Sequence, residues 1–74
     1  MSIDVELFGQ LMSKMQRRQT LEMASPTLIR EVVNKMGLNE DEIGLITVDG
    51  VQSELDDVIH PGSRLCFFPH MSGG

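Results

Sequence analysis

The sequence predicts a small α+β domain in which a mixed sheet of four to five strands packs on one main helix. Three observations predict this class: two segments near the start of the chain alternate between apolar and polar side chains, one central segment carries a single apolar stripe, and β-rich segments follow it. Alternation with a period of two is typical of half-buried strands, and apolar steps of three and four residues are typical of a helix. The 74 residues are enough for one domain.

Two strands are predicted near the N-terminus, over residues 3–8 and 17–23. In the first strand the odd-numbered residues are apolar and share one face, whereas Phe8 falls on the opposite face with two acidic residues. The second strand alternates in the same way. Residues 10–16 show neither period and are expected to form a turn or loop, so the two strands are predicted to form a hairpin.

The central helix gives the clearest local pattern. Ser25 is a good N-cap, and Pro26 stands at the favoured first helical position. Gly37 fits the C-terminal cap. The apolar stripe between these ends consists of Leu28, Ile29, Val32, Val33 and Met36.

The remaining strands complete the predicted sheet. Residues 45–48 form a β-rich segment that ends at the turn dipeptide Asp49-Gly50, and residues 51–55 are a candidate for another short strand. Residues 56–59 are interpreted as the start of a helical turn, and residues 64–68 as the last strand. This order of elements is that of the β-grasp (ubiquitin-like) fold, in which the first and last strands lie side by side and parallel.

The chain is expected to divide into a β-grasp domain over residues 1–69 and a flexible tail over residues 70–74. Pro69 cannot donate a hydrogen bond to a strand ladder, so the sheet is expected to stop there. The tail reads His70, Met71, Ser72, Gly73 and Gly74. Glycine has no Cβ, so a Gly-Gly end can thread a narrow channel of another protein and present its carboxylate there. The alternative is that small residues simply gather at chain ends.

Charge and composition argue against several classes of function. The net charge of −5 disfavours a nucleic-acid-binding protein. The only basic cluster is Arg17-Arg18, with Lys14 nearby, and it is interpreted as a solvated turn or edge strand. His60 and His70 lack partners at ligand spacing, so no metal and no cofactor is expected. With no nucleophile–base pair either, the chain is expected not to be an enzyme.

The expected compartment is the cytoplasm. Cys66 is the only cysteine, so no internal disulfide can form. The first residues have no basic region and no long apolar run, which argues against a signal peptide. No stretch approaches the roughly 18 apolar residues that a membrane-spanning helix needs. We therefore expect no association with a membrane.

Residues 62–74, which read Gly-Ser-Arg-Leu-Cys-Phe-Phe-Pro-His-Met-Ser-Gly-Gly, resemble the C-terminal signature of the MoaD/ThiS family of ubiquitin-like sulfur-carrier proteins. The segment Phe67-Phe68-Pro69, followed by Ser72-Gly73-Gly74, is most similar to molybdopterin synthase small subunits. Residues 3–9 also resemble the first strand of the family. The chain departs from the family pattern at Asp49, Ser63 and His70, where Asn, Asp and Pro are common.

The resemblance implies a mechanism in which other proteins carry out the chemistry. An E1-like adenylating enzyme would use ATP to adenylate the carboxylate of Gly74, and a sulfur donor such as a cysteine desulfurase system would convert it to a thiocarboxylate. A sulfur-accepting synthase, in the molybdopterin case the large subunit of molybdopterin synthase, would then take the sulfur. The carrier would only position the reactive carbonyl.

A partner-docking surface is predicted at Phe8, Phe68 and Pro69. By parity, both rings point away from the apolar face of the sheet, and adjacent exposed aromatic rings suggest a docking patch. The family places partner contacts on that face, which adds support. The alternative is that sheet twist or a bulge places the rings at the edge of the core. The residues expected to thread the partner's site are His70, Met71, Ser72 and Gly73.

Other functions fit the same sequence. The chain could carry sulfur for thiamin or another thio-metabolite, or it could be a ubiquitin-like modifier that is joined through Gly74 to lysines of target proteins. It could also be a plain binding module in which Gly73-Gly74 has no role.

Overall fold

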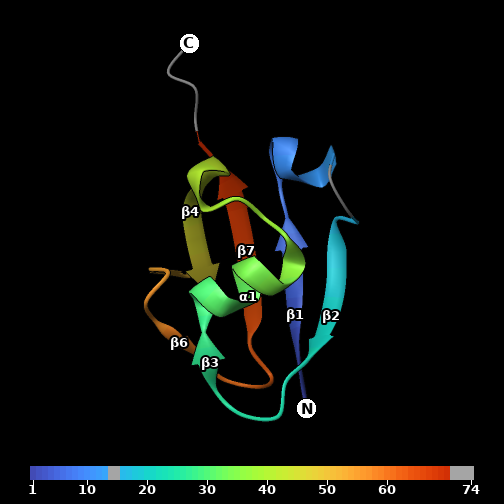
Figure 1. Ribbon diagram of the computed structural model, residues 1–74, viewed down its shortest axis with the longest axis vertical. Helices are drawn as coiled ribbons and strands as arrows, with labels where there is room; N and C mark the ends of the chain where they lie inside the picture. The colour runs from blue at the N-terminus through green and yellow to red at the C-terminus, as the bar shows by residue number, and fades with distance from the viewer. Residues whose placement is uncertain (14–15, 71–74) are drawn as a thin grey trace.

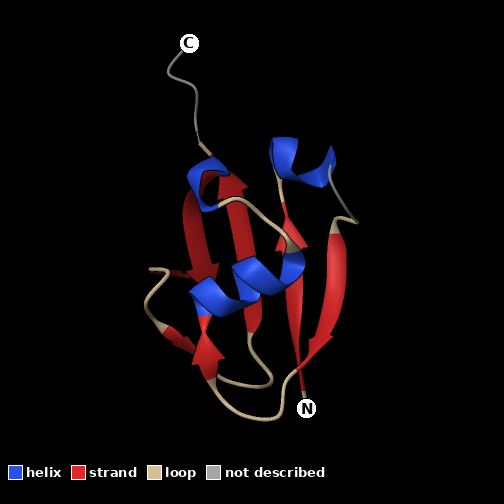
Figure 2. Cartoon of the chain, in the orientation of Figure 1, coloured by secondary structure: helices blue, strands red, loops and turns tan. Residues whose placement is uncertain are grey.

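The computed structural model describes residues 1–13 and 16–70. A five-stranded mixed sheet is covered on one face by a single helix, which confirms the predicted β-grasp class (Figures 1 and 2). The strands of this sheet lie in the order β2-β1-β7-β4-β5. Their bounds are β1 Ser2–Leu7, β2 Arg18–Glu22, β4 Ile43–Val48, β5 Val51–Ser53 and β7 Arg64–Pro69. The helix is α1, Ile29–Met36.

The two central strands come from opposite ends of the chain. β1 pairs in parallel with β7, so that Val5 lies opposite Leu65 and Leu7 opposite Phe67. β2 flanks β1 and β4 flanks β7, both in antiparallel pairing. The predicted parallel pairing of the first and last strands is therefore confirmed, and β7 ends at the opposite end of the molecule from the N-terminus (Figure 1).

The core lies between α1 and the sheet. Odd-numbered residues of β1 and β7 point toward the helix, and their even-numbered neighbours point to the opposite side of the sheet, which we call the open face. The buried apolar residues are Ile3, Val5, Leu7, Leu11, Ile29, Val32, Val33, Leu38, Ile43, Ile46, Ile59, Leu65 and Phe67.

The predicted start of the helix is wrong. α1 begins at Ile29, three residues after Pro26, and its N-cap position is Leu28, which makes no side-chain capping bond. The first amide groups instead donate to backbone carbonyls of a later loop: Ile29 to Asp57 at 3.0 Å and Arg30 to Leu55 at 2.9 Å. These long-range bonds satisfy the amide groups that a Ser25 cap would otherwise serve.

Residues 27 and 28, predicted as part of the first helical turn, instead form one strand of a two-stranded ribbon. β3 (Thr27–Leu28) pairs antiparallel with β6 (Val58–Ile59). The interpretation of residues 56–59 as a helical turn is therefore wrong, because extended pairing places Ile59 in the core. A sequence pattern confined to either segment cannot reveal this pairing, since each strand has only two residues.

The other local predictions are largely confirmed. Gly37 ends α1 with a left-handed φ of 78°, and its N–H bonds back to the helix. The strand expected within residues 51–55 is present as Val51–Ser53. Two short 3₁₀ helices add to the predicted elements. Gly9–Ser13 overlaps the loop predicted over residues 10–16, and Glu40–Glu42 is capped by the side chain of Asn39.

Candidate functional site: the tail base and the open face

The predicted site divides between described and undescribed residues. Met71, Ser72, Gly73 and Gly74, expected to carry and thread the reactive end, lie outside the described residues. Pro69 and His70 are described, and we call them the tail base because the tail continues from them. The structure therefore describes the end of β7 and the first residue of the predicted tail.

Pro69 is the last residue of β7 and lies opposite Ile43 in β4. The sheet ends there, as the missing amide hydrogen of proline predicts. Gly9 approaches the ring of Pro69 from the side of β1: a Cβ added at Gly9 would lie 2.6 Å from Cγ of Pro69. The φ of Gly9 is +58°, which also favours glycine at this position.

Gly44 approaches the tail base from the other side. It lies where the pairing of β4 with β7 shifts register between Ile43 and Leu45. A Cβ at Gly44 would lie 2.7 Å from Cα of His70 and 2.8 Å from the carbonyl oxygen of Pro69. Two glycines therefore let the backbone close around the tail base, and a side chain at either position would push against it.

His70 makes one further contact at the tail base. Its Nε2 lies 2.8 Å from the carbonyl oxygen of Asp41, in the 3₁₀ helix before β4. A carbonyl oxygen only accepts hydrogen bonds, so Nε2 carries the proton in this contact. The bond links His70 to the segment that precedes β4.

Replacing Gly44 by alanine is expected to displace the tail base. The new Cβ would meet backbone atoms of Pro69 and His70, which cannot rotate aside as a side chain can. Overpacking of this kind costs about 1–3 kcal/mol of the free energy of unfolding. Urea unfolding measures this cost. The amide chemical shift of His70 and the Cα and carbonyl ¹³C shifts of Pro69 report the displacement. Gln52→Ala, on the neighbouring β5, is the control and should change stability by less than about 0.5 kcal/mol. Unchanged shifts at residues 69–70 in Gly44→Ala would contradict the prediction.

Phe8 and Phe68 stack on each other beside the tail base. Their ring centroids are 4.5 Å apart and the planes differ by 9°. Both residues are half-buried, so each keeps part of its surface exposed on the open face. The predicted adjacency of the two rings is confirmed. We call these two residues the aromatic pair; its use as a docking surface stays a prediction.

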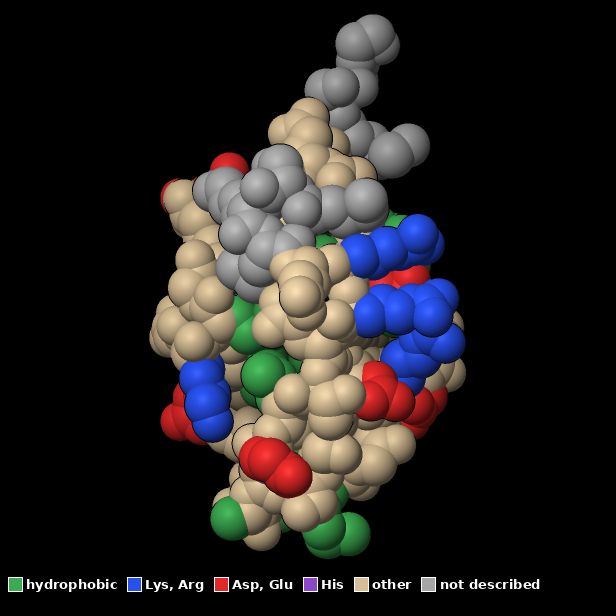
Figure 3. All heavy atoms as spheres, turned by 90° about the vertical axis from the view of Figure 1, so that its right-hand side faces the viewer, with side chains coloured by type: hydrophobic (Ala, Val, Ile, Leu, Met, Phe, Trp, Pro, Cys, Tyr) green, Lys and Arg blue, Asp and Glu red, His purple; other side chains and the backbone are tan. Residues whose placement is uncertain are grey.

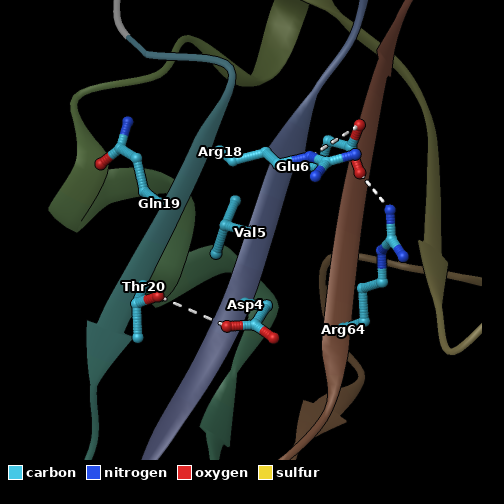
Figure 4. Close-up of a pocket in the computed structure, with 7 residues that line it drawn as sticks. All are labelled: Asp4, Val5, Glu6, Arg18, Gln19, Thr20 and Arg64. Atoms are coloured by element: carbon cyan, nitrogen blue, oxygen red, sulfur yellow. Dashed lines mark hydrogen bonds and ion pairs between the residues drawn. The ribbon is translucent and has the colours of Figure 1, made fainter.

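The sequence interpretation missed the group that lies next to the aromatic pair. Glu6 is only 3% exposed although it belongs to the open face. One of its carboxylate oxygens accepts from Arg64, and the other lies 3.1 Å from Nε of Arg17 and 3.6 Å from Nε of Arg18. Figure 4 shows Arg18 reaching Glu6 from β2 and Arg64 reaching it from β7. We call the three arginines the arginine cluster.

Arg17 and Arg18 are exposed at the start of the edge strand β2, as the sequence interpretation expects, and the arginine cluster adds a contact that the sequence interpretation did not include. Their side chains are 52% and 74% exposed, yet both guanidinium groups converge on a buried carboxylate. Arg17 also lies over the ring of Phe8, with 5.5 Å from its guanidinium carbon to the ring centroid, which is within cation–π range. In the register of β1 and β2, Glu6 lies directly opposite Arg18, and opposite charges across neighbouring strands attract. This pairing within the predicted hairpin is the feature from which the contact could have been predicted.

The pKa of Glu6 lies below its ordinary range, and the largest cause is the hydrogen bond from Arg64. The positive charges of the three arginines lower the pKa further, whereas burial of the carboxylate raises it. A depressed pKa in the folded state contributes stability above the unfolded pKa, about 4.3, which is lost as the pH falls through the folded value. We therefore expect Glu6→Gln to be less stable than the wild type at pH 7. The gap in urea midpoint should narrow as the pH falls through the depressed pKa of Glu6, because the protonated carboxyl group is neutral like the glutamine amide. A gap that stays the same from pH 7 down to the lowest pH at which both proteins fold would contradict this assignment.

A shallow hollow of about 330 Å³ lies on the open face beside these groups. Its lining residues, shown in Figure 4, are Asp4, Val5, Glu6, Arg18, Gln19, Thr20 and Arg64. Within residues 1–13 and 16–70 we find no group of three or more His, Cys, Asp or Glu side chains placed to hold a metal ion. In the same part of the chain, no helix is long and apolar enough to cross a membrane.

Solved structures with this architecture are ubiquitin-like proteins. SAMP1 from Haloferax volcanii, a small archaeal modifier protein, matches with a TM-score of 0.80 and 18% identity over 100% of both chains. A putative molybdopterin converting factor subunit 1 from Pyrococcus furiosus matches with a TM-score of 0.76 and 15% identity, over 95% of this chain and 98% of that one. A chain of the complex of molybdopterin-converting factor subunits 1 and 2 from Helicobacter pylori matches with a TM-score of 0.66 and 16% identity, over 100% of both chains. At these low sequence identities the similarity shows a shared fold and no more. By its fold, this chain is a β-grasp protein of the ubiquitin-like class.

Sequence comparison gives the family within that class. The family model of the ThiS family matches residues 5–74. The match includes the predicted tail and every open-face residue that follows Asp4 in the sequence. This chain therefore belongs to the ThiS family, the ThiS/MoaD-like family of ubiquitin-like sulfur carriers. A search of the curated proteins finds no significant match.

Proposed function

We propose that this protein carries sulfur as a thiocarboxylate on Gly74 and supplies it to molybdopterin synthesis. The observation that carries the proposal is the family match, which runs to Gly74. The tail base supports it, because two glycines shape the point at which the tail leaves the sheet. The aromatic pair supports it as well, since it places exposed apolar surface beside that point.

The proposed reaction takes place in partners. An adenylating enzyme would join the Gly74 carboxylate to the α-phosphate of ATP and release pyrophosphate. A persulfide or sulfide sulfur would then attack the acyl carbon and displace AMP; a persulfide donor also needs a thiol to reduce its S–S bond. The carrier would contribute no catalytic group and bind no cofactor; its part would be to place the carbonyl in the partner's site. The expected cytoplasmic location stays a prediction.

The molybdopterin assignment draws on two further observations. The segment Phe67-Phe68-Pro69 and the final Ser72-Gly73-Gly74 resemble the synthase small subunit. The Helicobacter pylori structure, similar in fold, is a complex of two subunits of molybdopterin-converting factor. A second subunit that receives the tail would be the sulfur acceptor for this chain too.

A role as a protein modifier is the second candidate. It is favoured by the similarity to SAMP1, which is described as a modifier protein. The same acyl-adenylate would serve this role, with a lysine amine of a target protein in place of the sulfur donor. The two functions therefore differ in the nucleophile that attacks Gly74 and not in the carrier's own geometry.

Intact mass is the measurement that tests the proposal. The chain is incubated with ATP, cysteine and a desalted extract of its native cells, and we expect the exchange of one oxygen for one sulfur, mapped to Gly74. An unchanged mass, with an extract that modifies a known carrier, would refute the carrier function. Covalent adducts through Gly74 would instead support the modifier. Loss of molybdoenzyme activity, without a requirement for thiamin, on deletion of the gene would support the molybdopterin assignment.

A further inference from the structure

The arginine cluster makes part of the open face positive although the whole protein is acidic, and we call this part, formed by the three arginines around Glu6, the positive patch. Arg17, Arg18 and Arg64 are three of the six basic residues of the chain. Together with Glu6 they carry a net charge of +2, and including Asp4 on the same face lowers the sum to +1. Because the whole chain carries −5, all the other residues together carry −6. In Figure 3 a group of Lys and Arg side chains lies at the right of the view with acidic side chains beside it, whereas another basic side chain lies apart at the left.

Stability alone does not require three arginines here. A carboxylate can be satisfied by one guanidinium group, which matches both of its oxygens. Each further arginine in the cluster adds repulsion between like charges and contributes little as a surface ion pair, because exposed pairs are worth only about 0–1 kcal/mol. The side chains remain 52%, 74% and 57% exposed, so the charges are available to a partner.

Position links the patch to the proposed function. Arg17 lies over Phe8, which stacks on Phe68, and Phe68 precedes Pro69 at the tail base. The positive patch, the aromatic pair and the tail base therefore form one continuous surface. A partner that contacts the tail base would therefore lie next to the aromatic pair and the positive patch.

We propose that this surface docks on an acidic region of the adenylating enzyme, with enzyme carboxylates pairing with Arg18 and Arg64 and apolar side chains covering the aromatic pair. This inference rests on the proposed function. We assign the adenylating enzyme because it meets the carrier in its free form and must select it. Charge complementarity speeds encounter and excludes wrong partners, so a local positive patch would allow an enzyme to recognise a carrier that is acidic elsewhere. Glu6 is the positioning residue, since its buried carboxylate holds the guanidinium groups in place.

The test compares two charge reversals of equal size. Arg18→Glu alters the patch, whereas Lys35→Glu alters an exposed residue of α1, on the other side of the sheet. The initial rate of thiocarboxylate formation on Gly74 is measured by intact mass over a range of carrier concentrations, with ATP, cysteine and a fixed amount of desalted native extract. Arg18→Gln is included as a milder variant, and thermal unfolding confirms that each variant is folded.

We expect Arg18→Glu to raise the half-saturating carrier concentration by about tenfold and Arg18→Gln by about threefold, with an unchanged maximal rate, because rim charges act mainly on association. Lys35→Glu should change it by less than about twofold. Higher salt should raise the half-saturating concentration of the wild type more than that of Arg18→Glu, since exposed charges are screened within about 8 Å at physiological ionic strength.

Equal effects of Arg18→Glu and Lys35→Glu would overturn the docking proposal and leave the carrier function intact. An effect of folded Arg18→Gln on the maximal rate alone would overturn it as well. If the wild-type chain forms no thiocarboxylate, the proposed function fails and the docking proposal falls with it. The wild-type reaction therefore separates the two failures.

Discussion

Deleting Gly73 and Gly74 is expected to abolish the oxygen-for-sulfur exchange while leaving the fold unchanged. The core residues all lie between Ile3 and Phe67, so the truncation removes no buried side chain among them. The shortened tail loses about 7 Å of reach at roughly 3.3–3.6 Å per residue, and the new terminal carboxylate would belong to Ser72. Intact mass after incubation with ATP, cysteine and native extract measures the loss, and urea unfolding checks the fold.

Gly74→Ala is the matched control for this deletion. It keeps the length of the tail and the position of the carboxylate. The added Cβ restricts the φ angle of residue 74 and makes the end of the tail wider, so that it fits a narrow channel less well. We expect a slower exchange with the same final mass shift. A truncated chain that still gained the sulfur, or still supported molybdoenzyme activity in cells, would refute every function built on Gly74.

Replacing Phe67 by alanine is expected to unfold a large fraction of the protein near body temperature. The ring is fully buried between the sheet and α1, and Phe→Ala changes in cores cost about 3–5 kcal/mol. Domains of this size are at the low end of the usual 5–15 kcal/mol of total stability. With a shift of roughly 4–8 °C per kcal/mol, the unfolding midpoint should fall by more than about 10 °C in a thermal melt.

Phe68→Ala is the natural comparison because it changes the neighbouring residue in the same strand. Phe68 points to the open face and stacks on Phe8, so its loss should cost the domain only about 1–2 kcal/mol. If the aromatic pair docks on the adenylating enzyme, the half-saturating carrier concentration should rise by tenfold or more, as expected for an anchor residue. Similar melting points for the two variants would contradict the assignment of Phe67 and Phe68 to opposite faces.

The fold could be predicted from the sequence because its main elements have local causes. Alternation in β1 and β7, the apolar stripe of α1 and the cap at Gly37 each depend on neighbouring residues. The start of α1 could not be predicted in this way, since its first amides bond to carbonyls of residues 55 and 57. Ser25 and Pro26 form a strong local start signal, and the pairing of β3 with β6 overrides it.

The candidate site shows the same division. The adjacency of Phe8 and Phe68 followed from side-chain parity and from the expected parallel pairing of the outermost strands in the sequence. The arginine cluster did not, because it combines a loop residue, an edge strand and the last strand around a carboxylate that the alternation placed in solvent. Parity gives the face on which Glu6 lies, but burial on that face depends on which long side chains fold over it.

The central position of β7 has a consequence for when the carrier becomes functional. β1, β2 and α1 are synthesised first, yet β1 and β4 have no strand between them until residues 64–69 are present. Contacts between segments so far apart in the chain form late in folding, because the intervening loop must first be closed. The strand that closes the sheet is also the one that carries Phe68 and leads into the tail. An incomplete or misfolded chain could therefore not assemble the surface that we propose docks on the adenylating enzyme, and under that proposal the enzyme would activate only chains that have finished folding.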